Sequence, residues 1–302
     1  MTYKFDFKKM WPLLAVLAAA VVAIPLRVAQ YIKYIDASTG FFNEINASVI
    51  IFYVLVAAAA AIGFAMPLIR RKDLKPAPIA FKSVQFTVVS LIMAVTLIVD
   101  SAVQLMNYFD LVSLGSIQAA GSIKEYLSAQ GATLLLLQAL SGAATAVYFF
   151  VSGVTVGLGN ADISKYKVIS LIPVLWCIFR LLYRFKRTIS FVNVSDLLLE
   201  LFMIVFSMMF FFAVAQINSK IDINEKGSEL INSLFWKVFS YGIPAAVFAV
   251  ICFIPRFVLL LTGNKEFINT HYPVCFGDIG FIVYAVFTCI TALKANTGAD
   301  DE

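Results

Sequence analysis

Residues 47–69 read ASVIIFYVLVAAAAAIGFAMPLI and contain no charged side chain. An α-helix rises about 1.5 Å per residue, so a run of this length crosses the roughly 30 Å hydrocarbon core of a bilayer. The rest of the 302-residue chain has a similar character, since 61% of its residues are hydrophobic and only 14% are charged. A soluble chain is about 25% charged. The sequence therefore predicts an integral membrane protein and excludes a disordered, fibrous or disulfide-stapled chain.

Apolar runs of similar length recur along the chain and predict an all-α, polytopic transmembrane helical bundle of about eight spans in a single membrane domain. The spans are expected at residues 11–32, 47–69, 83–106, 132–157, 166–186, 194–217, 236–261 and 274–293. Residues 1–23 also have the basic start and small residues of a cleaved signal peptide, although the apolar run continues through Ala29 to a full span. Residues 295–302 are polar and acidic and are expected to form a frayed tail.

The longest predicted loop, residues 107–131, is long for a structureless connection in a compact protein. It contains three glycines and a short segment, Ile123–Leu127, whose composition favours a helix at the membrane interface or a re-entrant helix. We expect this loop to be an interfacial or mobile element. Because no other loop is longer, any binding or catalytic site must be built within the membrane or at its surface.

The distribution of lysine and arginine predicts which side of the membrane each loop faces. An even number of spans places both ends of the chain on one side, and the basic loop Arg70–Lys82 places that side in the cytoplasm. The end of the fifth span and the loop that follows it violate this rule, because four basic residues there would fall on the outer side: Arg180, Arg184, Lys186 and Arg187. Either acidic neighbours offset these charges or the number of spans is wrong by one. The net charge of +5 reflects this asymmetry, and nucleic acid is not an implied partner.

Spans five and six contain an intramembrane charge cluster that is the first candidate site: Arg180, Arg184, Asp196 and Glu200. Arg180 and Arg184 are four residues apart and therefore share a face of one helix, and Asp196 and Glu200 do the same on the next helix. In an antiparallel hairpin, Arg184 comes level with Asp196. Arg180 comes level with Glu200. Because an unpaired charge costs about 2.5–3.5 kcal/mol at the centre of a spanning helix, we expect ion pairs. Two interpretations stay open, a structural ion-pair hairpin capped at Asn193–Asp196 and a site for an ion or charged ligand.

Span four contains polar residues spaced by three or four positions, which places them on one helix face. With two polar residues of span three, they form a candidate polar path: Asp100, Gln104, Gln138, Ser141, Thr145, Tyr148, Ser152 and Thr155. The same helix contains the small-residue pairs Gly142–Ala146 and Gly153–Gly157, which are typical of close helix packing in membranes. The polar face therefore lines either a water-filled path or a tight helix contact.

The sequence predicts no catalytic residue, metal site or cofactor. Asp100 and Asp278 invite comparison with the aspartate pair of aspartyl intramembrane proteases, but Cys275–Asp278 lacks the first glycine of a Gly-x-Gly-Asp motif. There is no HExxH, Gly-x-Ser-x-Gly or Walker sequence. The four cysteines lie in apolar runs without CxxC spacing and are interpreted as small core residues. An enzyme is therefore not favoured, although a lipid-modifying one without a short motif stays open.

Three further basic residues lie near predicted span ends: Arg27, Lys237 and Arg256. Long basic side chains in this position usually extend to the lipid headgroups, with the aliphatic stem in the apolar layer. We expect this placement for all three and assign them no role in a site.

Part of the chain resembles a group of membrane proteins. The segment Pro173–Leu182, PVLWCIFRLL, together with the turn Asn193–Asp196 and the Phe- and Met-rich run Phe202–Phe212, is similar to uncharacterised polytopic membrane proteins of Firmicutes bacteria. The resemblance implies a bacterial cytoplasmic membrane and carries no activity with it.

Two functional hypotheses follow from these patterns. The first is a permease or channel-like protein for an ion or small solute, in which the polar path conducts and the charge cluster acts as a gate or coupling element. The alternative is a non-transporting membrane partner, sensor or scaffold subunit, in which the charges are structural and residues 107–131 contact another membrane protein. Both place the chain in a lipid bilayer, as a multi-pass protein of the cell membrane.

Overall fold

The computed structural model describes residues 7–36, 42–69, 84–118, 122–158, 168–188, 194–220, 228–263 and 274–294. Of these residues, 91% are helical and none belongs to a strand, which confirms the predicted all-α class. The predicted tail and most of the connecting loops lie outside the described residues.

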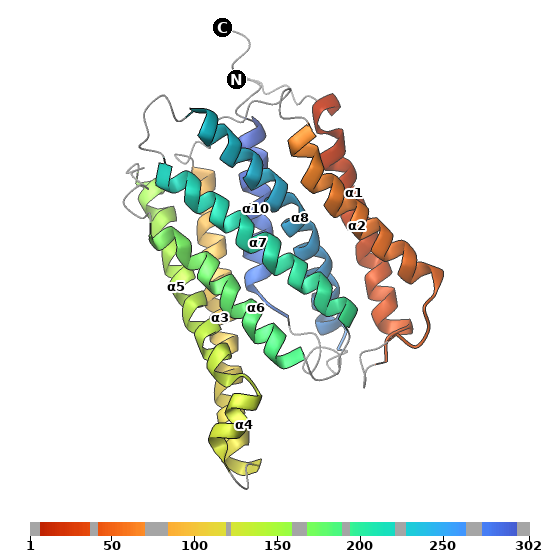
Figure 1. Ribbon diagram of the computed structural model, residues 1–302, viewed down its shortest axis with the longest axis vertical. Helices are drawn as coiled ribbons and strands as arrows, with labels where there is room; N and C mark the ends of the chain where they lie inside the picture. The colour runs from red at the N-terminus through yellow and green to blue at the C-terminus, as the bar shows by residue number, and fades with distance from the viewer. Residues whose placement is uncertain are drawn as a thin grey trace.

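The described residues contain eight long helices: α1 (Phe7–Lys33), α2 (Ala47–Ile69), α3 (Val84–Gln118), α5 (Ala132–Gly157), α6 (Ile172–Thr188), α7 (Val194–Lys220), α8 (Ser228–Leu261) and α10 (Gly277–Lys294). A short helix, α4 (Ile123–Ala129), connects α3 to α5, and a 3₁₀ turn, η2 (Ile169–Leu171), precedes α6. Successive long helices run in opposite directions along a common axis (Figure 1). The first turn of α1 and the last turn of α10 consequently lie at the same end of the bundle (Figure 1).

Five helical segments within the described residues are long and apolar enough to cross a membrane: Ala47–Ile69, Val84–Gly115, Ala132–Gly157, Leu197–Ile217 and Phe235–Leu261. A shorter apolar segment, Gly277–Ile290, lies in α10. The membrane character of the chain therefore agrees with the prediction. The number of eight spans is not confirmed.

The bundle has an apolar exterior and a partly charged interior, the reverse of a soluble protein. Large apolar side chains such as Val54 and Val147, which are 63% and 61% exposed, lie on the outer faces of α2 and α5. Arginine, aspartate and glutamate side chains are instead among the buried residues. Soluble proteins rarely expose extended apolar surface, whereas a surface that contacts lipid must be apolar.

Helix α8 lies at the centre of the bundle and packs against α1, α2, α7 and α10. Aromatic side chains fill the space between its neighbours. Phe210 of α7 meets Phe281 of α10 with ring centroids 5.8 Å apart and planes at 87°, and Phe149 of α5 meets Tyr284 of α10 at 5.0 Å. Edge-to-face pairs of this kind place the positive ring edge on the negative ring face. They connect α10 to both sides of the bundle.

Helices α3 and α5 pack against each other through small residues. A Cβ atom at Gly153 would lie 3.0 Å from Ser90 Cβ, and one at Gly157 would lie 3.1 Å from Thr87 Oγ1. The Thr87 hydroxyl donates a hydrogen bond to the Gly153 carbonyl across the contact, at 3.1 Å. The predicted small-residue packing is therefore confirmed for this face of α5.

The structure differs from the prediction in the 107–131 region. Helix α3 continues to Gln118, twelve positions past the predicted end of its span at residue 106, and a predicted short helix is present as α4. Hydropathy falls after Met106 because polar residues begin there. Residues 107–118 nevertheless contain no proline and a single glycine, Gly115, so the helix continues. The end of α3, α4 and the start of α5 project beyond the other helices (Figure 1).

Candidate functional site

Two arginines of α6 begin the site. Arg180 and Arg184 are four residues apart, so both side chains leave the helix on the same face, and both are buried. The opposite face of α6 exposes Leu175, Leu182 and Phe185, which suit a lipid environment. The segregation of basic and apolar residues on two faces turns both guanidinium groups toward the interior of the bundle.

Arg180 forms a bidentate ion pair with Asp278 in the first turn of α10. Nη1 donates to Oδ1 at 2.5 Å and Nη2 donates to Oδ2 at 2.9 Å. Two parallel charge-assisted hydrogen bonds fix both the distance and the plane of the two groups. Asp278 also lies at the positive end of the α10 dipole, which stabilises its negative charge. This pair therefore joins α6 firmly to the start of α10.

Glu200 of α7 bridges arginines from two other helices. Its Oε1 accepts a hydrogen bond from Arg184 Nε at 2.7 Å, and its Oε2 accepts one from Arg256 Nη1 of α8 at 3.0 Å. Oε1 also lies 3.5 Å from Arg180 Nη2. Glu200 and Arg256 are each 3% exposed. We call these five residues the charge network: Arg180, Arg184, Glu200, Arg256 and Asp278.

The network agrees with part of the predicted charge cluster. The expected contact between Arg180 and Glu200 is present, but it is the longest ion pair of the network, and Asp278 is the principal partner of Arg180. Arg184 pairs with Glu200. Its predicted partner Asp196 lies in the first turn of α7, and the Asp196 side chain is outside the described part of the structure.

Sequence reasoning missed Arg256 and misjudged Arg27. Both were expected to extend to lipid headgroups, and both are buried instead, whereas Lys237 is exposed. Arg256 lies 56 residues from Glu200 in the chain, so no local spacing predicts the pair. The position of Arg256 near the end of an apolar run suggested contact with lipid headgroups. Its side chain is buried instead, because other helices surround α8.

Arg27 of α1 occupies a separate aromatic environment. Its guanidinium carbon lies 4.8 Å from the Tyr31 ring centroid and 5.1 Å from that of Phe52, and its Nη1 donates to Gln30 Oε1 at 2.9 Å. The Gln30 side chain in turn donates to the Ser48 carbonyl at the start of α2, at 3.1 Å. Rings that face a desolvated guanidinium stabilise its charge, so this arrangement connects α1 to α2 inside the bundle.

The start of α10 lies between Arg180 of α6 and Asp100 of α3. Asp100 is 1% exposed, and its Oδ1 accepts a hydrogen bond from the Phe276 backbone N–H at 3.0 Å. The Cys275 thiol forms a second hydrogen bond with it. In the described part of the chain, no lysine or arginine forms an ion pair with Asp100. Gln104, one turn further along α3, is also buried.

The predicted polar face of α5 is largely buried and bonded within its own helix. The Ser141 hydroxyl donates to the Gln138 carbonyl at 3.1 Å, and the Thr145 hydroxyl donates to the Ser141 carbonyl at 2.7 Å. Ser152 and Thr155 bond in the same way to carbonyls of the preceding turn. Tyr148 is buried too, and only Thr155 is partly exposed. The hydroxyl groups therefore need no water in this conformation.

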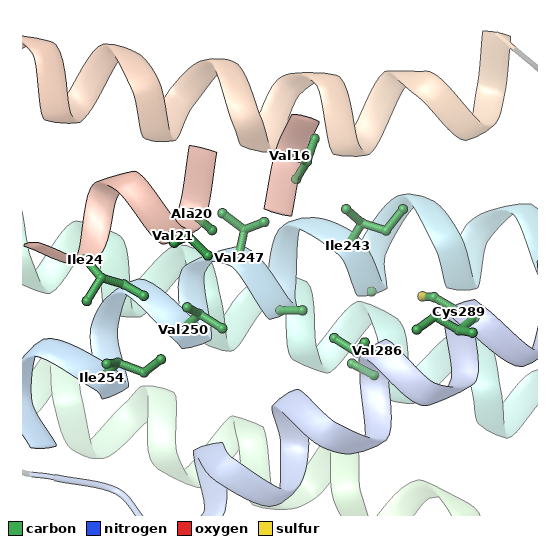
Figure 2. Close-up of a pocket in the computed structure, with 14 residues that line it drawn as sticks. Val16, Ala20, Val21, Ile24, Ile243, Val247, Val250, Ile254, Val286 and Cys289 are labelled. Carbon is green, nitrogen blue, oxygen red and sulfur yellow. The ribbon is translucent and has the colours of Figure 1, made fainter. Parts of the chain in front are cut away.

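A cavity of about 190 Å³ lies between α1, α8 and α10 and has an apolar lining (Figure 2). Val16 and Ile24 of α1 face Val247 and Ile254 of α8 across it (Figure 2). Val286 of α10 is also part of the lining. A cavity lined only by apolar groups stays dry. It therefore provides no hydrogen-bond partner for a polar solute. The candidate site is instead the charge network with Asp100.

The network, Asp100 and the polar face of α5 are thus the features on which a function can be argued. Comparisons of the chain with models of protein families, with curated proteins and with solved structures found no match.

Proposed function

We propose that this chain is a multi-pass permease or channel-like protein of a bacterial cell membrane, and that the charge network gates the passage of an ion or small solute. The observation that carries the proposal is the burial of five paired charges from α6, α7, α8 and α10 at one level of an apolar bundle. Ionisable groups within membrane helices are rare and typically mark ion or substrate pathways.

The energetics of buried ion pairs support a functional role for the network. The desolvation of each charge offsets most of the attraction, so a well-packed apolar core is often as stable as a buried ion-pair network. Apolar residues at these positions would therefore hold the helices together equally well. Charges that can exchange partners, as Glu200 can among three arginines, suit an element that rearranges during a transport cycle.

The network also bears on the proposed orientation, with both ends of the chain in the cytoplasm. It lies where α6 and α8 end and where α7 and α10 begin, at the opposite end of the bundle from the start of α1 (Figure 1). Arg180 and Arg184 are turned inward and paired, so they do not act as free cations in an outer loop. This pairing favours the explanation in which acidic neighbours offset the charges that conflict with the positive-inside rule.

One observation favours the alternative of a non-transporting partner, sensor or scaffold. The hydroxyl groups of Ser141, Thr145 and Ser152 all bond within α5, as expected for a dry packing face. In that case the projecting end of α3 and α4 is the surface that meets another membrane protein. For a permease, the polar face of α5 becomes the proposed path when the network opens.

A flux assay tests the permease proposal. We expect purified protein in lipid vesicles to accelerate the passage of at least one of four probes, H⁺, Na⁺, K⁺ and Cl⁻, relative to empty vesicles. Arg180→Lys keeps the charge but loses the bidentate geometry, so flux should change by about tenfold, equivalent to about 1.4 kcal/mol. Glu125→Gln, which alters an exposed acid on α4, is the matched control. Vesicles no leakier than empty ones would refute the proposal.

The accessibility of introduced thiols distinguishes a water-filled path along the polar face of α5 from a dry packing contact. In a background with the native cysteines replaced by alanine, Thr145→Cys and Ser152→Cys should react with a water-soluble maleimide if their face lines a path. Val147→Cys, on the lipid-exposed side of the same helix, should stay unreactive. Unreactive thiols at both test positions, during flux as well as at rest, would favour the packing interpretation.

A further inference from the structure

The start of α10 lies inside the bundle and is held by side chains from two other helices. Residues 274–276 are non-helical, and Val274 and Cys275 are buried. Gly277, the first residue of α10, packs between Leu97 of α3 and Trp176 of α6, because a Cβ atom there would lie 3.2 Å and 3.4 Å from their side chains. Irregular backbone at membrane depth is tolerated only where protein surrounds it or where it lines a cavity.

The two acids that hold this segment have different partners. Asp278 binds the Arg180 guanidinium through both oxygens, so this carboxylate has a directly paired cation. Within the described residues, the hydrogen-bond partners of Asp100 are the Phe276 N–H and the Cys275 thiol. Burial without a paired cation penalises the ionised form of a carboxyl group. Asp100 is therefore an acid whose environment allows it to take up a proton.

The ionisable groups that act on Asp100 from neighbouring elements are Arg180, Cys275 and Asp278. Arg180 attracts the carboxylate and Asp278 repels it, and the guanidinium is already engaged by Asp278 and Glu200. Helix α5, which packs along α3, contains no acidic, basic or cysteine residue. Helix α4 brings Lys124 and Glu125, which are exposed at the projecting end of α3.

We propose that Asp100 is a proton-binding site and that its protonation loosens the start of α10 from α3. In the ionised state, its hydrogen bond with the Phe276 N–H is charge-assisted. Protonation leaves a neutral carbonyl oxygen as the acceptor, and hydrogen bonds to neutral acceptors are about half as strong. The Arg180–Asp278 pair remains on the other side, so the released segment moves with α6. This inference deepens the proposed function, on which its transport consequence rests, by naming the proton as the coupling ion.

Infrared difference spectroscopy tests proton binding without any transport measurement. We expect wild-type protein in vesicles to gain the carbonyl band of a protonated carboxyl group as the pH falls, and Asp100→Asn to lack that band. Asp110→Asn removes an exposed acid from the same helix and should retain it. A titration that is identical in wild type and Asp100→Asn, over the pH range in which both stay folded, would overturn the proposal.

Hydrogen exchange tests the release of α10. Asparagine keeps an uncharged acceptor oxygen and so imitates the protonated acid. At a fixed pH at which Asp100 is ionised, the peptide that contains Phe276 should exchange about fivefold faster in Asp100→Asn than in wild type. The same peptide should be unchanged in Asp110→Asn. Equal exchange in all three proteins would contradict the release.

The transport consequence is measured separately. Flux through wild-type protein should depend on pH in the range of the infrared titration, and Asp100→Asn should lose that dependence. Retained pH dependence in this variant would refute coupling through Asp100. If no probe crosses the wild-type vesicles, the permease proposal fails, while the infrared and exchange results still decide whether Asp100 binds a proton and releases α10.

Discussion

Replacement of Glu200 by glutamine is expected to destabilise the folded protein by about 3–5 kcal/mol, the typical cost of breaking a buried ion pair from one side. Glu200 is the shared partner of Arg184 and Arg256 and a more distant partner of Arg180. Glutamine keeps the size and one acceptor oxygen but removes the negative charge. The arginines then lose their common counter-charge in a setting where water cannot replace it.

Thermal unfolding in detergent micelles measures this effect. Glu125→Gln makes the same chemical change on exposed α4 and should unfold at the wild-type temperature. A double variant, Glu200→Gln with Arg256→Gln, removes a cation together with the anion and should recover part of the loss. Equal unfolding temperatures for wild type and Glu200→Gln would show that the network contributes no net electrostatic stability.

Substitution of Gly280 by alanine is expected to have the second-largest effect. A Cβ atom at this position of α10 would overlap the Thr96 hydroxyl of α3 and lie 2.8 Å from the Met93 Cα. The Met93 backbone cannot rotate away, so the two helices must separate. Overpacking of this kind typically costs about 1–3 kcal/mol. Over most of this range the cost is larger than the gain of about 1 kcal/mol that alanine normally brings to a helix interior in place of glycine.

Gly157→Ala supplies the matched control for Gly280→Ala. Its Cβ would lie 3.1–3.2 Å from side-chain atoms of Thr87, at the last residue of α5, where a shift of a few tenths of an ångström at the helix end relieves the contact. We expect Gly157→Ala to unfold near the wild-type temperature and Gly280→Ala to unfold several degrees lower. In Gly280→Ala, the displaced α10 should also strain the Arg180–Asp278 pair two residues away. A more stable Gly280→Ala would contradict the close packing of α3 and α10.

Sequence patterns predicted the features that depend on local periodicity. The α-helical class follows from the length of the apolar runs, and the glycines that approach α3 follow from their four-residue spacing on α5. The charged residues of α6 were also recognisable, because Arg180 and Arg184 share a face within an apolar segment. These signals all lie within one helix, where the backbone geometry is fixed.

The partners of those charges depend on how distant helices pack, which no local pattern encodes. An antiparallel hairpin pairs α6 with α7 alone, whereas Asp278 is 98 residues from Arg180 and belongs to α10. The end of α3 was misplaced for a different reason. Hydropathy indicates where lipid ends, and a helix that enters water continues until a residue stops it.

The long chain separation between Arg180 and Asp278 affects the assembly of the protein during synthesis. Because Asp278 follows Arg180 by 98 residues, we expect α6 to be synthesised well before its principal counter-charge. Glu200, only 20 residues after Arg180 and 3.5 Å from it in the folded protein, is the expected interim partner until α10 is added. We therefore expect a nascent chain that stops short of α10 to keep an under-neutralised guanidinium, a defect by which membrane quality control can distinguish it from the finished protein.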